Sequence, residues 1–344
     1  MKKPQKKNER VTIKHVAAAA GVTIGTVSNV INGTAVVSEE TKAQVKAAIE
    51  ELHYVPNMTA KFLRSKKNKS VGILIPDLNN SFYYRVLSAF INQAFGNGYI
   101  VRIFGYEYSL EKELQIIDSL IGDSVDIVII LSGIGDEAGI QRMLNAGKKV
   151  ILADRNTNLE GVKCLYYDNY QEVFRAIGLL KEKGYQNVGF LSEPSTMPNV
   201  GEREKAFREA VVAHGLPLRE ENIYMLDNYS QFVLVNGYEY VKRLLDRKEK
   251  SEIPDAFLVS SDLMAIGTIK ALKERGLKVP EDIGIIGFDN LDISSFVEPN
   301  LTTIEQDQEA MGCALFRMVQ AMYEGEEIED KVILQQKLIV RDSC

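Results

Sequence analysis

The chain has 344 residues, of which 45% are hydrophobic and 26% charged, proportions typical of a globular protein with two or three structural units. No apolar stretch approaches the roughly 20 residues that span a bilayer, so we expect no membrane partner. The basic start, MKKPQKKNERV, has no apolar segment after it, which argues against a secretory signal and for a cytoplasmic location. Three scattered cysteines and three histidines predict neither a disulfide framework nor a metal site.

The net charge of −6 is unevenly distributed. Residues 1–70 contain 13 Lys and Arg against five Glu, whereas the rest contains 28 basic and 42 acidic side chains. A basic end on an acidic body is typical of a protein that binds a polyanion. Its affinity for nucleic acid would fall with salt, because neutralised phosphates release counterions. A basic tail that only aids solubility has the same composition, so charge alone leaves both possibilities open.

The first predicted elements are three short helices. Thr12 can cap the first helix, and Gly21 provides the left-handed residue that ends it. Thr23 can cap a second helix over residues 24–31, and Ser38 a third. Two short helices joined by a tight glycine-containing turn form a helix-turn-helix.

The second predicted helix divides its residues between two faces. Val27, Val30 and Ile31 share an apolar stripe, while the start of the other face is where a recognition helix contacts the major groove. Asparagine matches the adenine edge, isoleucine can contact a thymine methyl, and hydroxyls suit phosphates. A small α-hairpin with a solvated polar face is the alternative. In this helix and its flanks, the expected DNA contacts are Thr12, Thr23, Ile24, Gly25, Thr26, Ser28 and Asn29.

Longer motifs make the interpretation specific. They are AGV-T-x-x-TVS-x-V-x-N, Val37-Ser38-x-x-Thr41 and Tyr54-x-Pro56-Asn57-x-x-Ala60-x-x-Leu63, in this order. The segment resembles the DNA-binding headpiece of the lactose-repressor (LacI/GalR) family of bacterial regulators. His15 stands where members usually have Asp, which we interpret as a surface change. Asn29 stands where many members have Arg, which should alter the preferred operator base.

The resemblance implies a hinge over Asn57–Leu63. In such repressors the hinge becomes helical on DNA, enters the minor groove in pairs, and wedges a leucine between base pairs. Leu63 stands at the leucine position, and Ala60 faces the partner hinge. So short a helix is unstable alone, so its folding can be coupled to binding. An ordinary basic linker, with Leu63 docked on the body, is the alternative.

From Ser70 onward, short apolar strands alternate with amphipathic helices. This alternation predicts parallel sheets covered on both faces, in two Rossmann-like lobes over about 70–167 and 168–295, with a return to the first lobe near Leu301–Thr303. The predicted strands are 70–76, 99–105, 126–131, 149–154, 187–192, 222–226, 256–261 and 282–288. The predicted helices are 83–96, 111–121, 137–146, 169–183, 202–214, 236–247 and 262–275.

The ends of these strands supply candidate ligand-binding residues, because two-lobed α/β proteins bind ligands there. Carboxylates accept hydrogen bonds from hydroxyl groups and aromatic rings stack on sugar faces, so the set predicts a polyhydroxylated ligand. Each acid by itself could also be a turn or helix cap. The polar candidates are Asp77, Asp154, Ser261, Asp262 and Asp289, and the aromatic ones Phe82, Tyr83, Phe232 and Phe288.

The body resembles the periplasmic-binding-protein-like effector core of the same family, so the resemblance covers essentially the whole chain. It rests on GILIPDLNNSFYY, Asp154-Arg155, Asp168-Asn169, SSD-x-x-A-x-G, GFDN and LTTI-x-Q. Ser261 replaces a usual Asn, Ala206 a common Gly and Ser81 a Pro, so the ligand's identity is not carried over. The resemblance implies effector-binding roles for Phe82, Tyr83, Asp154, Arg203, Phe232, Ser261, Asp289 and Gln306.

Two other functions, a dinucleotide-binding enzyme and a secreted sugar-binding protein, match parts of the sequence. Gly133-x-Gly135-x-x-Ala138 loosely fits a dinucleotide fingerprint, but Asp136 and Glu137 would repel a pyrophosphate, and the preceding strand is the third of its lobe. No phosphate loop, nucleophile elbow or HExxH pair occurs, so we expect no enzyme and no cofactor. A secreted sugar-binding protein fits the body but not the basic headpiece.

The expected protein is therefore a sequence-specific transcription regulator, a repressor whose operator binding responds to a sugar or related metabolite in the interlobe cleft. The expected domains are a headpiece (1–56), a hinge and linker (57–69) and a ligand-binding and dimerisation body (70–344). Two headpieces that bind a palindrome require a symmetric dimer. The final residues, LIVRDSC, contain no apolar heptads, which predicts a homodimer rather than a tail-assembled tetramer. The resemblance favours induction by the ligand over corepression.

Overall fold

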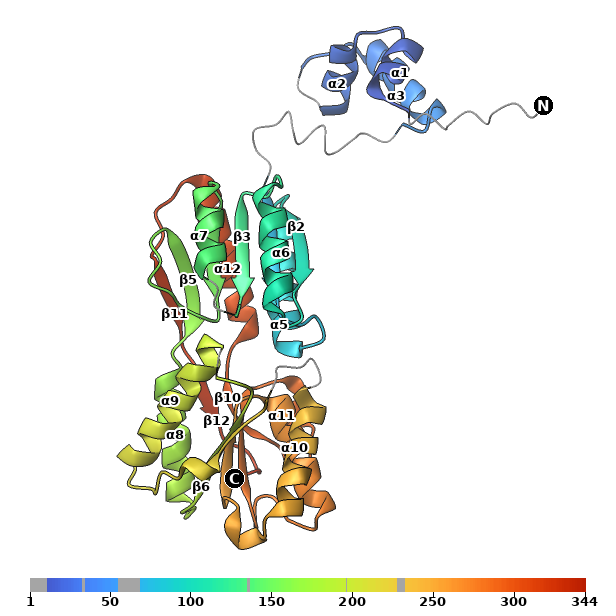
Figure 1. Cartoon of the computed structure of the whole chain (residues 1–344). Helices are drawn as coiled ribbons and strands as arrows, with labels where there is room; N and C mark the ends of the chain where they lie inside the picture. Colours follow the sequence, from blue (N-terminus) through green and yellow to red (C-terminus); the bar gives the residue numbers. More distant parts are fainter. Residues whose placement is uncertain (1–10, 33–34, 55–68, 135–136, 196, 228–232) are drawn as a thin grey trace, which may run out of the picture. The chain divides into compact units, whose positions relative to one another are not determined.

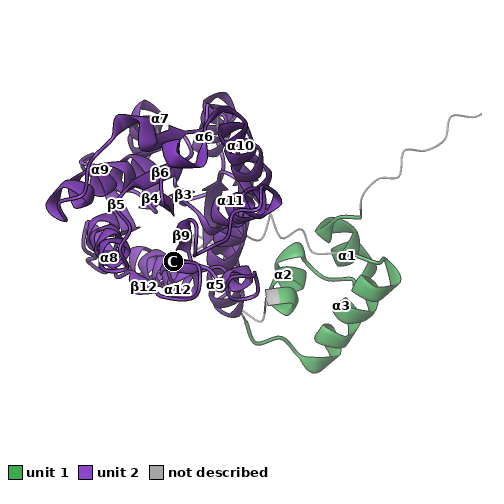
Figure 2. Ribbon diagram, turned by 90° about the horizontal axis from the view of Figure 1, so that it is seen from below, with its two compact units in different colours: residues 1–68 green, residues 69–344 purple. Residues whose placement is uncertain are grey.

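The computed structural model describes residues 11–32, 35–54, 69–134, 137–195, 197–227 and 233–344 (Figure 1). The chain forms two compact units, residues 1–68 and 69–344 (Figure 2). The predicted hinge residues Asn57, Ala60 and Leu63 lie outside the described residues, as does the predicted aromatic Phe232. Within the described ranges, no helix is long and apolar enough to cross a membrane.

The first unit contains the helices α1 (Ile13–Ala19), α2 (Ile24–Asn32) and α3 (Glu39–Glu51). Gly21 has φ 65° and ends α1. Thr23 caps α2, because its Oγ1 accepts a hydrogen bond from the Thr26 N–H at 3.1 Å. The three helices pack around a small core, so α1 and α2 form the predicted helix-turn-helix. The buried core residues are Val16, Ala17, Val27, Val45 and Ala48.

The second unit contains two six-stranded sheets, each in its own lobe. In the sheet of the first lobe all neighbouring strands are parallel. Helices α5 (Ser81–Gly96) and α12 (Gln308–Glu324) pack against one face of it, and α6 (Leu110–Ile121) and α7 (Glu137–Asn145) against the other. The strands, in spatial order, are β11 (Lys331–Leu334), β5 (Val162–Tyr167), β4 (Lys149–Ala153), β3 (Ile127–Leu131), β1 (Ser70–Ile75) and β2 (Ile100–Gly105).

The second lobe repeats this layered arrangement. Helices α8 (Asn169–Glu182) and α9 (Pro198–Ala213) cover one face, and α10 (Val233–Arg247) and α11 (Asp262–Glu274) the other. Only the pairing of β12 with β10 is antiparallel among the described strands of this sheet. The strands, in spatial order, are β12 (Lys337–Ile339), β10 (Thr302–Glu305), β9 (Gly284–Asp289), β8 (Ala256–Val259), β6 (Val188–Ser192) and β7 (Ile223–Met225).

The predicted return to the first lobe near Leu301–Thr303 was placed too early. Strand β10 is hydrogen-bonded to β9 and belongs to the second lobe. The chain crosses only after β10, when α12 packs beside α5 and β11 pairs with β5. It then crosses back, because β12 pairs with β10. The lobes are therefore joined by three connections, and the second lobe continues beyond residue 295.

Candidate functional site

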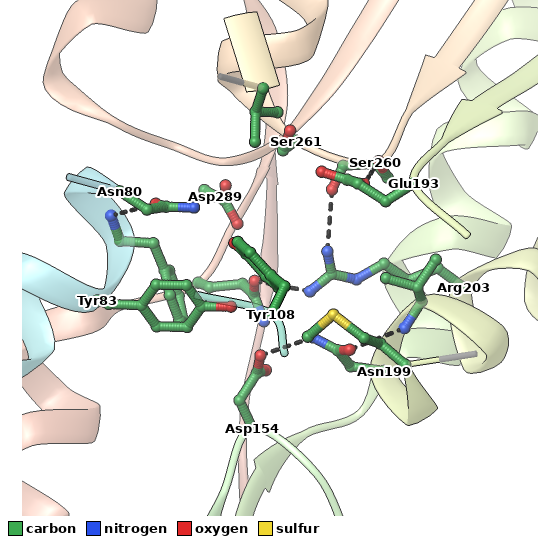
Figure 3. Close-up of a pocket in the computed structure, with 15 residues that line it drawn as sticks. Asn80, Tyr83, Tyr108, Asp154, Glu193, Asn199, Arg203, Ser260, Ser261 and Asp289 are labelled. Atoms are coloured by element: carbon green, nitrogen blue, oxygen red, sulfur yellow. Dashed lines mark hydrogen bonds between the residues drawn. The ribbon is translucent and has the colours of Figure 1, made fainter. Parts of the chain in front are cut away.

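A pocket lies between the two lobes, where residues that follow strands of both sheets come together (Figure 3). Its cavity of ≈ 50 Å³ corresponds to the space of a few water molecules. Its described lining combines carboxylates, amides and hydroxyls with the aromatic rings of phenylalanine and tyrosine side chains. The lining residues are Asn80, Phe82, Tyr83, Tyr108, Asp154, Glu193, Met197, Asn199, Val200, Arg203, Val233, Ser260, Ser261, Asp289 and Gln306.

Several lining residues have a left-handed backbone, which L-residues rarely adopt. Asp154, directly after β4, has φ 60°, and Asp289, at the end of β9, has φ 111°. Tyr108, which follows β2, has φ 54°. Such conformations cost of order 1–3 kcal/mol each, persist only where the surrounding structure imposes them, and cluster at binding sites. The sheet edges therefore hold these side chains at the pocket at a cost to stability.

Asp154 is 3% exposed, and uncharged groups hold its carboxylate. Its Oδ2 accepts hydrogen bonds from the Ser132 hydroxyl at 3.0 Å and the Asn199 amide at 2.7 Å. Its Oδ1 is buried and has no hydrogen-bond partner among the described residues. Burial raises the pKa of Asp154 above its ordinary value, because the charged form loses hydration. A ligand that donates a hydrogen bond to Oδ1 would satisfy this acceptor.

Arg203 on α9 is tied into the second lobe. Its Nε donates to Asn169 Oδ1 at 3.1 Å, its Nη1 to the Ser260 carbonyl oxygen at 2.9 Å, and its Nη2 to Gln306 Oε1 at 2.9 Å. The guanidinium carbon lies 3.8 Å from the centre of the Phe288 ring, within range of a cation–π interaction. Within the described part of the chain, Gln306 Nε2 is buried and has no hydrogen-bond partner, which leaves a donor for a ligand.

Asp289 and Ser261 complete the polar lining from the second lobe. Burial raises the pKa of Asp289 well above its ordinary value, and the nearby carboxylates of Asp262, Asp154 and Glu193 raise it further. The Ser261 hydroxyl is buried and finds no hydrogen-bond partner in the described ranges. The pocket thus contains two buried acids together with unpaired donors and acceptors, which is the chemistry needed to bind a hydroxylated molecule.

The structure brings the predicted effector residues together, although their binding role stays a prediction. Phe232, the eighth of them, lies outside the described residues. Two of the strand-end acids do not line the pocket: Asp77 accepts the Asn79 N–H at 2.8 Å, and Asp262 accepts three hydrogen bonds within the second lobe. The predicted residues that do line it are Phe82, Tyr83, Asp154, Arg203, Ser261, Asp289 and Gln306.

Glu193 is a pocket residue that the sequence reasoning missed. It directly follows β6 and accepts a hydrogen bond from the Ser260 hydroxyl. The rule that selected Asp154 and Asp289, an acid just after a buried strand, applies equally to Glu193. Tyr108 and Asn199 were also missed, and they come from loop and helix positions that no strand-end rule identifies.

In the first unit, the predicted DNA-contacting side chains lie on the accessible side of α2 and its flanks. Thr12, Thr23 and Ile24 are exposed, whereas Val27 on the opposite stripe is buried. Asn29 is partly exposed. The facial division of α2 is therefore as predicted, and contact with DNA stays a prediction.

Known proteins share both units. Residues 12–57 match the family of bacterial regulatory proteins of the lacI family, and residues 177–344 a periplasmic binding protein-like domain. The chain is 33% identical over 326 residues to catabolite control protein A of Priestia megaterium, covering 94% of this chain and 96% of that protein. This chain belongs to the lacI family. As a member of that family it is a DNA-binding transcription regulator and not an enzyme.

Other lacI-family relatives align over nearly the full length. The transcriptional regulator CelR of Thermobifida fusca is 31% identical over 98% of this chain and 99% of its own. A CelR–cellobiose complex has a TM-score of 0.72 and 29% identity, covering 97% of this chain and 100% of that one. The structure of the lac repressor dimer bound to operator and an anti-inducer has a TM-score of 0.82 and 24% identity, covering 97% of this chain and 99% of that one. This similarity is one of fold.

Proposed function

We propose that this lacI-family regulator is a repressor whose affinity for operator DNA is controlled by a small molecule in the interlobe pocket. The observation that carries the proposal is the set of buried polar atoms without partners in that pocket, on Asp154, Ser261 and Gln306. A ligand that completes these hydrogen bonds favours the arrangement of the lobes in which it is bound. A sugar or related metabolite has suitable hydroxyl groups, and a relative forms a complex with cellobiose.

The first unit is proposed to bind a palindromic operator as part of a cytoplasmic homodimer, because a single short recognition helix reads few base pairs. Asn29 would bind adenine and Ile24 a thymine methyl, while Thr12, Thr23, Gly25, Thr26 and Ser28 position the helix on the backbone. Asn57, Ala60 and Leu63 would form the hinge in the minor groove.

Operator binding tests the DNA-binding half of this proposal. Duplexes selected from a random pool by the full-length chain should contain a palindrome. The chain should bind the palindrome at least roughly a thousandfold more tightly than random DNA, and the logarithm of affinity should fall linearly with the logarithm of salt concentration. Equal affinity for all duplexes would contradict sequence-specific binding.

The effector half is tested with Asp289→Ala. A thermal-shift screen of sugars, nucleobases and phosphorylated metabolites should identify a ligand that raises the midpoint of the full chain. Asp289→Ala should bind the operator as the parent does and lose the ligand's effect on that binding. Glu160→Ala, an exposed acid outside the pocket lining, serves as the control and should respond normally. A ligand response that survives in Asp289→Ala would place the effector elsewhere.

A further inference from the structure

The pocket is acidic. Among its described lining residues, Asp154, Glu193 and Asp289 are acids and Arg203 is the one base. In Figure 3 the three acidic side chains approach the cavity from different elements: the ends of β4, β6 and β9. A ligand in this cavity therefore meets carboxylates on several sides.

Arg203 is held by uncharged groups of the protein. Three of its N–H groups bind Asn169, the Ser260 carbonyl and Gln306, and its guanidinium carbon lies over the Phe288 ring. These partners leave the positive charge in place, and that charge counteracts the rise in the pKa of both Asp154 and Asp289. An anion in the pocket would therefore compete with these two carboxylates for one guanidinium.

The acids are likewise hydrogen-bonded by neutral groups, and Arg203 is the one positive charge that acts on Asp154 and Asp289 among the described lining residues. Asp154 is bound by a serine hydroxyl and an asparagine amide, and Glu193 by the Ser260 hydroxyl. Asp154 is more than nine-tenths buried, and its Oδ1 has no hydrogen-bond partner among the described residues. One base faces three acids in the described lining, and burial and the neighbouring carboxylates raise the pKa of Asp289 well above its ordinary value although Arg203 lowers it, so the acids are incompletely compensated.

We propose that the effector is a small hydroxylated molecule that carries a protonated amine, an amino sugar or amino polyol, and that Glu193 selects it over phosphorylated or carboxylated analogues. The proposal rests on the proposed function of this pocket. The ammonium group balances the carboxylates, the ligand's hydroxyls satisfy Asp154 Oδ1 and the Ser261 hydroxyl, and a ligand oxygen accepts from Gln306 Nε2.

Matched ligands on one scaffold provide the test. Dissociation constants of the full-length chain are measured by calorimetry for glucose, galactose and mannose, for the 2-amino-2-deoxy form of each, and for each 6-phosphate. We expect one amine to bind about tenfold or more tightly than its parent sugar, with a preference that weakens as the salt concentration rises. The 6-phosphate of that sugar should bind about tenfold or more weakly than the parent sugar. A parent sugar or phosphate that binds as tightly as its amine overturns the proposal, as does a series in which no amine binds.

Glu193→Gln separates charge selection from general affinity for sugars. This variant should lose about tenfold in its preference for the amine over the parent sugar. Glu160→Gln is the matched control, because Glu160 is exposed and lies outside the pocket lining; it should retain the preference. Unchanged selectivity in Glu193→Gln would overturn the role of this residue.

Operator binding, measured alongside, distinguishes this proposal from the proposed function. A neutral sugar that binds more tightly than its amine and alters operator affinity would overturn the charge selection and keep the regulator. An amine that binds selectively without altering operator affinity would keep the charge selection and overturn the proposed regulation of operator binding.

Discussion

At the scale of single residues, Asp262 shows how a polar core group can resemble a binding residue. Its carboxylate accepts the Leu291 N–H at 2.8 Å and the hydroxyls of Ser294 and Thr303 at 2.5 Å each. These bonds connect the start of α11 to the segment after β9 and to β10. Burial nevertheless raises the pKa of Asp262 from 3.8 to about 6, because desolvation outweighs the hydrogen bonds.

Stability should therefore depend on pH through Asp262. Since the folded-state pKa is raised, the contribution of this group is fully present below about pH 4 and is lost as the pH rises through about 6. Denaturant titrations measure the free energy of unfolding of the parent and of Asp262→Asn. The parental value minus that of the variant should fall as the pH rises from about 4 to about 6. Asp118→Asn, at an exposed position on α6, should keep the parental pH slope. An Asp262→Asn curve parallel to that of the parent would refute the assignment.

Sequence reasoning at this scale found the acids whose position on the chain reveals them. Asp154 and Asp289 follow buried strands, and both lie at the pocket. The same rule also selected Asp262, because the position of a strand end does not tell on which side of the sheet edge a side chain points. Arg203 lies within a helix, and only the family resemblance indicated it.

At the scale of elements, α10 and α11 pack with their backbones in close approach. A Cβ on Gly267 would lie 2.1 Å from the Leu234 carbonyl oxygen, and one on Gly237 would lie 2.6 Å from the Met264 carbonyl oxygen. Both distances are below any real van der Waals contact, and the opposing atoms are backbone. Each glycine is therefore required by the contact between the two helices.

Gly267→Ala should lower the free energy of unfolding by about 1–3 kcal/mol or more, because the two helices must move apart. Gly96→Ala at the end of α5 is the control: no atom lies within 4 Å of its added Cβ, and alanine is favoured over glycine in helices by about 0.5–1 kcal/mol. Urea unfolding followed by circular dichroism measures both. Equal stability of the two variants would show that α10 and α11 adapt without cost.

The sequence predicted most elements but placed some boundaries wrongly. Helix α9 begins at Pro198 and not at residue 202, because proline is favoured in the first helical turn. Strand β5 (Val162–Tyr167) was missed, since its mixed burial pattern lacks the continuous apolar run of its neighbours.

At the scale of the whole molecule, the sheets are completed by strands from far along the chain. Strand β11 is hydrogen-bonded to β5, and β12 to β10. Strands of three or four residues carry little pattern, so sequence reasoning could not assign them to a lobe. Because three connections join the lobes and the first unit leads into β1, a ligand that changes the angle between lobes acts on the lobe that carries the proposed hinge.

Leu63→Ser tests this coupling. The predicted hinge helix is too short to be stable alone. Only on DNA can the insertion of an apolar side chain between base pairs offset the free-energy cost of folding it. Leu63→Ser should therefore weaken operator binding at least a hundredfold, measured by fluorescence anisotropy, while the thermal shift produced by the effector and the mass of the proposed dimer stay as in the parent. If the operator affinity is instead unchanged, residues 57–63 act as an ordinary linker, and the ligand must reach the DNA-binding unit by another route.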